Sequence, residues 1–271
     1  MRDARRPLAL ALGSRMGALG RRWAAPGLLL LAALVAWEAG VRAAGVPHYI
    51  LPAPSRIARA LAGDWTLLAP HARVTAVEVL AGFGLALVTG LSLGLAMFRS
   101  GTLARALEPL LVASQTIPVF AVAPLLVLWL GYGLASKVAM AALIVFFPMA
   151  IATLDGLRSA DPDLVDWFRM ARASPRTILV AVQVPAALPQ VFTGMRVGAA
   201  VSVIGAVIGE WVGADAGLGY LMAKANAQLR VDLVFACLVV LSAFGIALVA
   251  AVRGLERLAT PWRAAPREEA A

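Results

Sequence analysis

Long stretches without charged side chains constrain this chain more than any other feature of its sequence. Residues 138–153 and 233–252 contain no charge, and residues 23–41 and 74–98 contain one each, Glu38 and Glu78. A helix crosses the roughly 30 Å hydrocarbon core of a bilayer with about 20 mostly apolar residues, whereas a barrel strand alternates apolar and polar residues over about ten. Because the apolar stretches are continuous, we expect an all-α integral membrane protein.

Two further stretches complete a pattern of about six transmembrane helices. One covers about residues 107–129, and the other follows Pro185 and Pro189 and reaches Val212. The composition agrees, because 61% of the 271 residues are hydrophobic and 14% are charged, against about half and a quarter in soluble domains. Six spans leave no room for a large soluble domain. A single cysteine and two histidines exclude a disulfide framework and a histidine-based metal site, and we expect no catalytic or metal-binding residues.

Basic residues predict the orientation of these spans. Arginines cluster before the first span, which places the N-terminus in the cytoplasm by the positive-inside rule, and six spans return the C-terminus to the same side. The predicted divisions are a basic cytoplasmic tail (1–22), a first transmembrane helix (23–44), an external linker with a short helix (45–72), a domain of five helices (73–255) and a cytoplasmic tail (256–271). Because the arginines flank spans and form no single soluble face, we expect contact with membrane lipid and no nucleic-acid binding.

The segment between the fourth and fifth spans, residues 155–189, mixes charged and apolar residues. Asp161 is suited to cap a helix that has Pro162 at its first position, and Leu164, Phe168 and Ala171 then fall on one helical face. The dipeptide Ser174-Pro175 ends that helix or starts the next one. The pattern predicts a short amphipathic helix at the cytoplasmic surface. Such a helix lies on lipid, or it docks a cytoplasmic partner.

This loop resembles the EAA loop of binding-protein-dependent ABC importer permeases. Asp166 stands at the glutamate position, Trp167 and Phe168 at the two alanines, and Arg172 at the glycine, with Pro185 and Pro189 near the closing prolines. Four more segments, 51–61, 107–138, 146–164 and 203–222, resemble permeases of the sulfonate, taurine and nitrate branch, so that the resemblance covers roughly residues 47–255. The last segment looks most like permeases for thiamine-pyrimidine precursors or riboflavin.

The resemblance implies a type I permease fold in the bacterial inner membrane and a set of partners. Two copies of the chain, expected to be a homodimer, would form the pathway, with ABC ATPase subunits below and an external substrate-binding protein above. ATP and Mg²⁺ would bind the ATPase, because this sequence contains no G-x-x-x-x-G-K-[ST] motif. We therefore expect a transport subunit and not an enzyme. Selectivity would reside mainly in the binding protein, and an uncharged heteroaromatic precursor is the favoured solute.

The resemblance also implies where the ATPase docks. We expect docking over residues 161–174, with Phe168 filling an apolar groove and Asp166 and Arg169 pairing with charges at its rim. Arg172 replaces a glycine that permits a turn, so it either adopts an unfavourable backbone geometry or continues the helix. The complete set of predicted coupling residues is Asp161, Leu164, Asp166, Phe168, Arg169, Arg172 and Ser174.

Acidic residues inside or beside the spans are functional candidates, because charges in a bilayer are costly. Glu38 lies one turn from Arg42 and Glu78 can reach Arg73, so structural roles are expected for both acids. Glu108 is expected to favour a helix start near the inner surface.

Three residues are candidates for the pathway or its outer gate. Glu210 and Trp211 end the fifth span near the expected outer mouth, where Glu210 gates the pathway, contacts the binding protein or simply anchors the interface. Pro118 interrupts the third span and indicates a pathway-lining re-entrant helix or a plain kink.

An ion-coupled secondary carrier that works without an ATPase is the main alternative. That alternative predicts paired buried charges or inverted repeats near the bilayer midplane. Small residues indicate close helix packing in either case, since Gly90 and Gly94 form a G-x-x-x-G pair that Gly194 and Gly198 repeat.

Overall fold

A computed structural model describes the backbone of residues 6–263 and the side chains of residues 25–263. The ends of both predicted tails, residues 1–5 and 264–271, and the side chains of the basic segment before the first span lie outside this part. The described chain is helical and contains no strand. Its helices are α1 (Arg6–Ala43), α2 (Pro54–Gly63), α3 (Trp65–Arg99), α4 (Gly101–Ser114), α5 (Val119–Leu130), α6 (Leu134–Arg158), α7 (Pro162–Met170), α8 (Pro175–Ile178), a π-helical turn (Leu179–Gln183), α9 (Val184–Gly213), α10 (Leu218–Ala227), α11 (Val231–Ala259) and a 3₁₀ turn (Pro261–Arg263).

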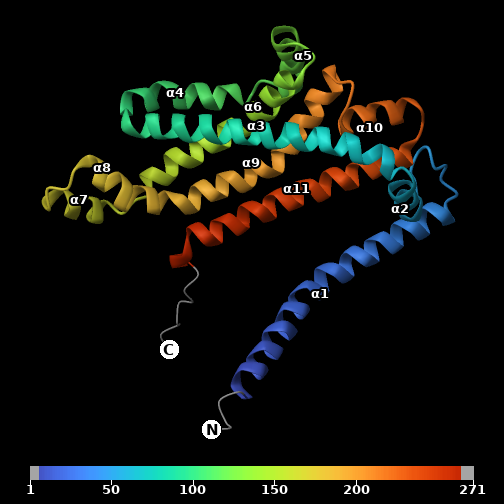
Figure 1. The fold of residues 1–271 in the computed structure, drawn as a ribbon, viewed down its shortest axis with the longest axis horizontal. Helices are drawn as coiled ribbons and strands as arrows, with labels where there is room; N and C mark the ends of the chain where they lie inside the picture. Colours follow the sequence, from blue (N-terminus) through green and yellow to red (C-terminus); the bar gives the residue numbers. More distant parts are fainter. Residues whose placement is uncertain (1–5, 264–271) are drawn as a thin grey trace.

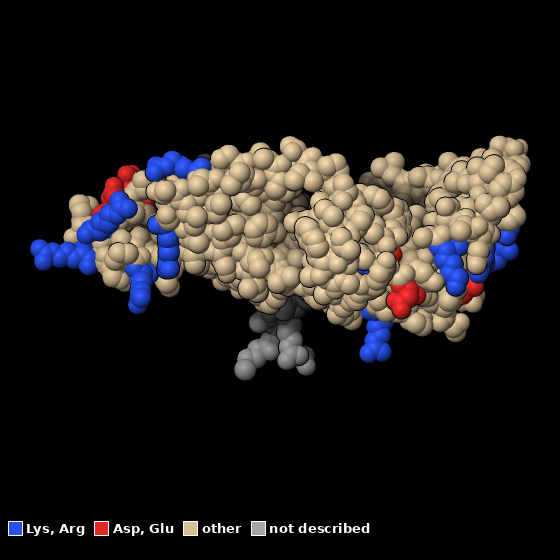
Figure 2. Space-filling view, turned by 90° about the horizontal axis from the view of Figure 1, so that it is seen from above, with Lys and Arg blue, Asp and Glu red and all other residues tan. Residues whose placement is uncertain are grey.

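Charged residues gather at the two ends of the molecule and leave an apolar belt between them (Figure 2). One end, here the α7 end, holds α7, α8 and the end of α3; the other, the α10 end, holds α2, α10 and the start of α3 (Figure 1). The N-terminal end of α1 and the C-terminal end of α11 both lie away from the α10 end, as they must in a chain that crosses the membrane an even number of times. Within the described residues, five helices are long and apolar enough to cross a membrane, and the α4–α5 pair makes a sixth crossing if it is one span. The prediction of about six transmembrane helices is confirmed.

The third span begins earlier than the expected residues 107–129 and is interrupted at Pro118, where the sequence predicted either a re-entrant helix or a plain kink. It consists of α4 and α5, which meet at an angle of 101°. The break lies where Pro118 precedes the first residue of α5, in extended backbone geometry. Proline has no N–H to donate, and the residue before it avoids the helical region, so the chain turns here. The bend supports a broken or re-entrant span rather than a plain kink.

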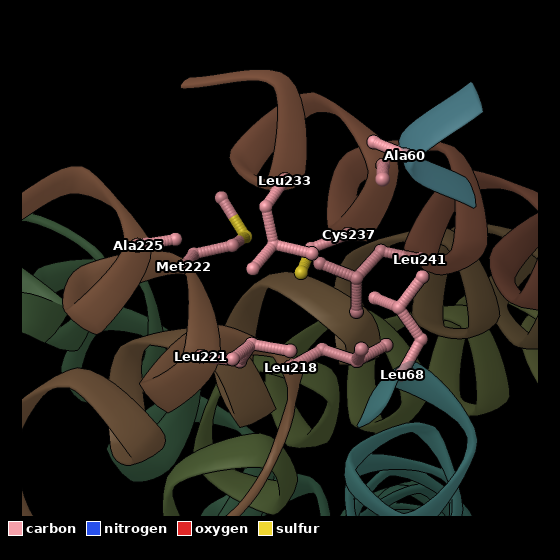
Figure 3. Packing of buried hydrophobic residues seen from close by; sticks show 10 residues of the cluster. Ala60, Leu68, Leu218, Leu221, Met222, Ala225, Leu233, Cys237 and Leu241 are labelled. Atoms are coloured by element: carbon pink, nitrogen blue, oxygen red, sulfur yellow. The ribbon is translucent and has the colours of Figure 1, made fainter. Parts of the chain in front are cut away.

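Helix α6 forms the axis of the bundle, because α3 and α9 both approach it through glycines. A Cβ atom on Gly90 of α3 would lie 2.6 Å from Cβ of Met149, and one on Gly205 of α9 would lie 2.7 Å from Cα of Ala141. Two clusters of buried apolar side chains flank these contacts. One surrounds Met149 between α3, α6 and α9, and the other contains Cys237 between α10 and α11 (Figure 3). The predicted close packing of small residues therefore has a defined partner, α6.

Helix α1 stands apart from this bundle and touches it near the α10 end (Figure 1). Glu38 forms an ion pair with Arg42 and accepts hydrogen bonds from the backbone N–H and the hydroxyl of Ser55, at 2.9 and 2.8 Å. The Trp37 ring lies 5.7 Å from that of Phe235 on α11. The expected structural pairing of Glu38 with Arg42 is present, and it helps to fix the end of α1 against α2.

Replacing Gly90 by alanine tests the packing of α3 on α6. The added methyl group meets Met149 and the backbone of residues 146 and 150, so we expect a loss of roughly 1–3 kcal/mol in unfolding free energy. Thermal unfolding in detergent measures this loss. Gly84→Ala is the matched control, because a Cβ atom there has no neighbour within 4 Å, and it should leave the melting temperature unchanged or slightly higher. Equal melting temperatures for both variants would refute the contact.

Candidate functional site

The loop at the α7 end is a compact helical hairpin whose caps follow the sequence. Asp161 accepts a hydrogen bond from the N–H of Asp163 at 3.0 Å, and α7 begins at Pro162. Ser174 accepts one from the N–H of Thr177 at 3.1 Å, so Ser174-Pro175 starts α8. Such N-terminal caps satisfy backbone donors that a helix leaves free. The loop is therefore a defined structure held between α6 and α9.

The exposed face of α7 differs from the predicted one. Val165 is buried and Phe168 packs against the cluster of Ala160, Val165, Ile178 and Val182. Trp167 and Met170, by contrast, are 64% and 75% exposed, and Leu164 is exposed beside them. Phe168, which the sequence analysis placed in an apolar groove of the ATPase, is partly buried within its own loop, because contact with α8 and the π-helical turn fixes the rotation of α7. Its role in docking stays a prediction. Asp166 and Arg169 remain exposed and pair with each other at 2.8 Å.

Arg172 adopts the unfavourable backbone geometry, with a φ of 57°. Its N–H donates to the carbonyl of Arg169 at 2.9 Å, and the N–H of Ala173 donates to the carbonyl of Phe168 at 3.0 Å. These two bonds form the Schellman arrangement, in which the left-handed position usually belongs to glycine. The turn geometry thus explains the glycine of the EAA pattern, and the arginine retains the turn at a cost in strain.

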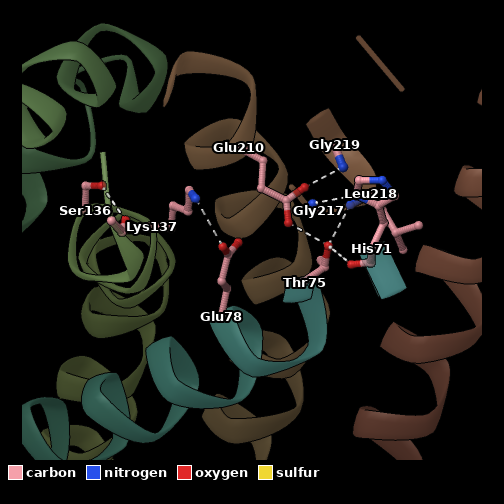
Figure 4. Close-up of polar contacts among 10 residues, drawn as sticks. His71, Thr75, Glu78, Ser136, Lys137, Glu210, Gly217, Leu218 and Gly219 are labelled. Atoms are coloured by element: carbon pink, nitrogen blue, oxygen red, sulfur yellow. Dashed lines mark hydrogen bonds and ion pairs between the residues drawn. The ribbon is translucent and has the colours of Figure 1, made fainter. Parts of the chain in front are cut away.

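A buried polar network at the α10 end joins three helices (Figure 4). Thr75 donates to Oε1 of Glu210 at 2.5 Å and accepts from the N–H of Leu218 at 2.8 Å. The N–H of Gly219 donates to Oε2 of Glu210, and the N–H of Gly217 donates to Nδ1 of His71 at 3.0 Å. Side chains of α3 and α9 therefore satisfy the free donors at the start of α10, where a carboxylate is also favoured by the helix dipole.

Glu78 continues this network toward α6. Its carboxylate lies 3.5 Å from Nζ of Lys137, and the two side chains are 1% and 6% exposed. The expectation that Glu78 pairs with Arg73 is wrong. Glu78 faces the interior between α3 and α6, whereas Arg73 is exposed. The other oxygen of Glu78 has no hydrogen-bond partner in the described chain. A buried pair of this kind is specific in geometry and sensitive to the loss of either member.

Sequence reasoning missed His71, Thr75 and Lys137. The first two precede Glu78 at positions i−7 and i−3, so all three share one helical face, and that spacing is the signal that was available. Lys137 directly precedes the charge-free residues 138–153, and nothing in that position indicates a buried acidic partner. The expectation that Glu108 favours a helix start is also wrong. Glu108 lies inside α4, away from any helix start, and pairs with Arg158 at 2.9 Å.

Glu210 and Trp211 point in different directions. Glu210 is 1% exposed with both oxygens hydrogen-bonded, so it does not lie at an open mouth. Trp211 is half-exposed and lies against Phe120 of α5, with 6.5 Å between the ring centroids, two residues beyond Pro118. Trp211 and the Pro118 break are thus close in space, and their role in a pathway stays a prediction. No group of acidic, histidine or cysteine side chains in the described chain is arranged to hold a metal ion.

Comparison with known proteins identifies the family. Residues 86–260 match the binding-protein-dependent transport system inner membrane component. The chain belongs to this family. It is therefore a multi-pass protein of the bacterial inner membrane, and the resemblance seen in its loop extends over most of its length.

Two relatives and one solved structure are similar to the chain over most of its length. The formylaminopyrimidine transport permease protein ThiX of Halalkalibacterium halodurans is 41% identical over 88% of this chain and 95% of its own. The riboflavin transport system permease protein RibX of Chloroflexus aurantiacus is 41% identical over 89% and 92%. The inward-facing MetNI methionine ABC transporter matches with a TM-score of 0.63 at 19% identity, over 73% of this chain and 98% of its own, and shows the shared fold. The predicted type I permease fold and subfamily resemblance are confirmed.

Replacing Lys137 by methionine tests the buried ion pair of this permease. Glu78 would then be left in the core without its partner, either charged or after taking up a proton, and we expect a loss of up to about 3–5 kcal/mol in stability. Thermal unfolding in detergent measures it, and Glu78→Gln in the same chain should restore part of the loss. Arg158→Met breaks the partly exposed pair with Glu108 and should cost about 1 kcal/mol or less. A larger effect of Arg158→Met than of Lys137→Met would contradict the assignment.

Replacing Arg172 by glycine tests the strained turn. We expect slower hydrogen exchange in α7 and α8, because glycine removes a penalty of roughly 1 kcal/mol at positive φ. Arg176→Gly is the control in the same loop, since it places glycine in the first turn of α8 and should speed exchange there. Faster exchange in Arg172→Gly would mean that the arginine side chain contributes more than its backbone costs.

Proposed function

We propose that this chain forms the dimeric membrane pathway of an ABC importer and couples ATP hydrolysis on a separate ATPase to solute uptake. A substrate-binding protein would deliver the solute at the α10 end, and the ATPase would dock at the α7 end. The observation that carries this proposal is the exposed apolar face of α7, held between two membrane-spanning helices. A helix fixed in this way transmits movement of a partner into the membrane.

The docking face consists of Leu164, Trp167 and Met170. These residues recur at intervals of three along α7 and are exposed, although all three are apolar. Aromatic anchors surrounded by polar residues dominate many interfaces, and Trp167 now takes the anchoring role that the sequence suggested for Phe168. The Asp166–Arg169 pair lies beside this face as a polar rim. Val165 and Phe168 on the opposite face tie the helix to the rest of the loop.

The loop is also tied to both adjoining spans. A Cβ atom on Gly156 of α6 would lie 3.0 Å from the carbonyl oxygen of Ala187 on α9, so the two backbones nearly touch where they enter the loop. Force applied to α7 therefore reaches α6 and α9 together. The chain has no nucleotide-binding motif, and ATP and Mg²⁺ are assigned to the partner ATPase.

The solute is proposed to be a thiamine-pyrimidine precursor or riboflavin. ThiX and RibX support this assignment, since each is 41% identical over nearly nine tenths of the chain. Charge agrees with it: in the described spans the buried Lys137 is paired with Glu78, and Arg196 forms an ion pair with Glu256. An anionic solute would find neither cation free. Sulfonate, taurine and nitrate rank second, and a homodimer of this chain is the proposed assembly.

An ion-coupled carrier remains the alternative, because it predicts paired buried charges and Glu78–Lys137 is such a pair. The two functions differ in their energy source. We propose purifying the protein gently from native membranes and reconstituting what co-purifies in vesicles. A stoichiometric ATPase and ATP-dependent uptake would support the importer. A solitary protein that transports without ATP would refute it and favour the carrier.

Trp167→Ala tests the docking face. We expect uptake to fall at least tenfold while the protein still inserts and dimerises, because the anchor on the ATPase is lost. Asp166→Lys should act in the same direction by reversing a rim charge. Trp262→Ala, which removes a similarly exposed tryptophan at the end of the chain, is the control and should leave uptake unchanged.

Phe168→Ala should act differently from Trp167→Ala. Its side chain packs inside the loop, so we expect faster hydrogen exchange in α7 together with reduced coupling. Undiminished uptake in both Trp167→Ala and Asp166→Lys would show that the ATPase docks elsewhere.

A further inference from the structure

An open groove runs between α9 and α11 along the surface of the described bundle. It has a volume of about 920 Å³. Its apolar lining includes Val203 and Ile204 on α9 and Ile246 and Val249 on α11, and Gly245 also lines it. Figure 1 shows the two helices side by side, with α1 splayed away from them. Nothing in the described chain fills this groove.

Two arginines close the groove at the α7 end. Arg253 and Arg257 lie one turn apart on α11, and both line the groove and are exposed. Glu256 lies between them in sequence, but it is engaged by Arg196 of α9. No acidic partner for either arginine occurs among the described residues. The groove thus combines an apolar trough with two positive charges at one end that no acid of the described residues pairs with.

We propose that this groove binds an anionic phospholipid of the cytoplasmic leaflet, with its headgroup phosphate on Arg253 and Arg257 and an acyl chain along α9 and α11. Basic pockets between membrane-spanning helices at this surface suit anionic headgroups. From Arg257 to Leu241 the groove extends about 24 Å along α11, longer than the roughly 15 Å depth of one leaflet, so an acyl chain fits beneath the arginines.

Charge distinguishes the lipid from the other obvious occupant, helix α1 of a second copy. That helix is apolar, but Arg15, Arg21 and Arg22 precede its membrane segment. In the N-in, C-in topology these arginines lie on the same membrane side as Arg253 and Arg257. Seating α1 in the groove would bring like charges together, whereas an anionic lipid neutralises them.

The test is lipid retention by the intact permease complex. The complex is reconstituted in nanodiscs containing equal parts of phosphatidylglycerol and phosphatidylcholine, released into detergent, and examined by native mass spectrometry. We expect retained phosphatidylglycerol to exceed phosphatidylcholine. Arg253→Ala with Arg257→Ala should reduce that preference roughly ten- to thirtyfold, the effect of two basic residues near an anionic surface. Arg99→Ala with Arg105→Ala removes two arginines at the same end of the bundle and should leave the preference intact.

A second variant separates the apolar trough from the arginines. A Cβ atom on Gly245 would lie 3.5 Å from Val203, an ordinary contact, so Gly245→Leu is accommodated and fills the groove. It should abolish retention of both lipids without changing charge. Equal retention of both lipids by the natural chain, or unchanged preference in the double arginine variant, would overturn the proposal.

Crosslinking tests the competing occupant directly. Cysteines introduced by Leu31→Cys in one copy and Ile246→Cys in the other report whether α1 lies in the groove, since the natural Cys237 is fully buried. An efficient crosslink between copies would overturn the lipid site and place α1 there. Its absence, together with the expected lipid preference, supports the lipid.

Discussion

The bundle depends on backbone contact between α6 and its two neighbours. Lipid tails are as apolar as the side chains of these helices, so hydrophobic burial alone does not hold them together, and close packing supplies much of the attraction. Glycines on α3 and α9 bring both helices against the same central helix. Everything at the two ends follows from this arrangement: α3, α6 and α9 carry the polar network at one end, and α6 and α9 frame the loop at the other.

The sequence predicts the features that depend on residues close together along the chain. Apolar runs locate the spans, and the caps of α7 and α8 follow from Asp161-Pro162 and Ser174-Pro175, because capping involves residues within one turn. The rotation of α7 is not local. It depends on Val165 and Phe168 meeting α8 and the π-helical turn, and a helical face drawn through Leu164 and Phe168 does not contain that information.

The polar network also has one part that the sequence predicts and another part that it does not. The spacing of His71, Thr75 and Glu78 places them on one face of α3, which is readable from the sequence. Their partners are not, because Glu210 and Lys137 come from helices far along the chain and meet α3 only through the packing on α6. The break in the third span lies between these cases: Pro118 marks the position, but the direction of the chain after it depends on what α5 packs against.

Helix α9 connects the loop at the α7 end directly to the polar network at the α10 end. Its 30 residues form a rod about 45 Å long that runs from the loop to Glu210. A tilt of roughly five degrees about one end displaces the other by about 4 Å, more than the length of a hydrogen bond. The bonds from Glu210 to Thr75 and to the start of α10 cannot stretch that far. If α9 tilts as a rigid helix, it would therefore either carry α3 and α10 with it as one body or break the hydrogen bonds of Glu210, with no intermediate in which those bonds are merely lengthened.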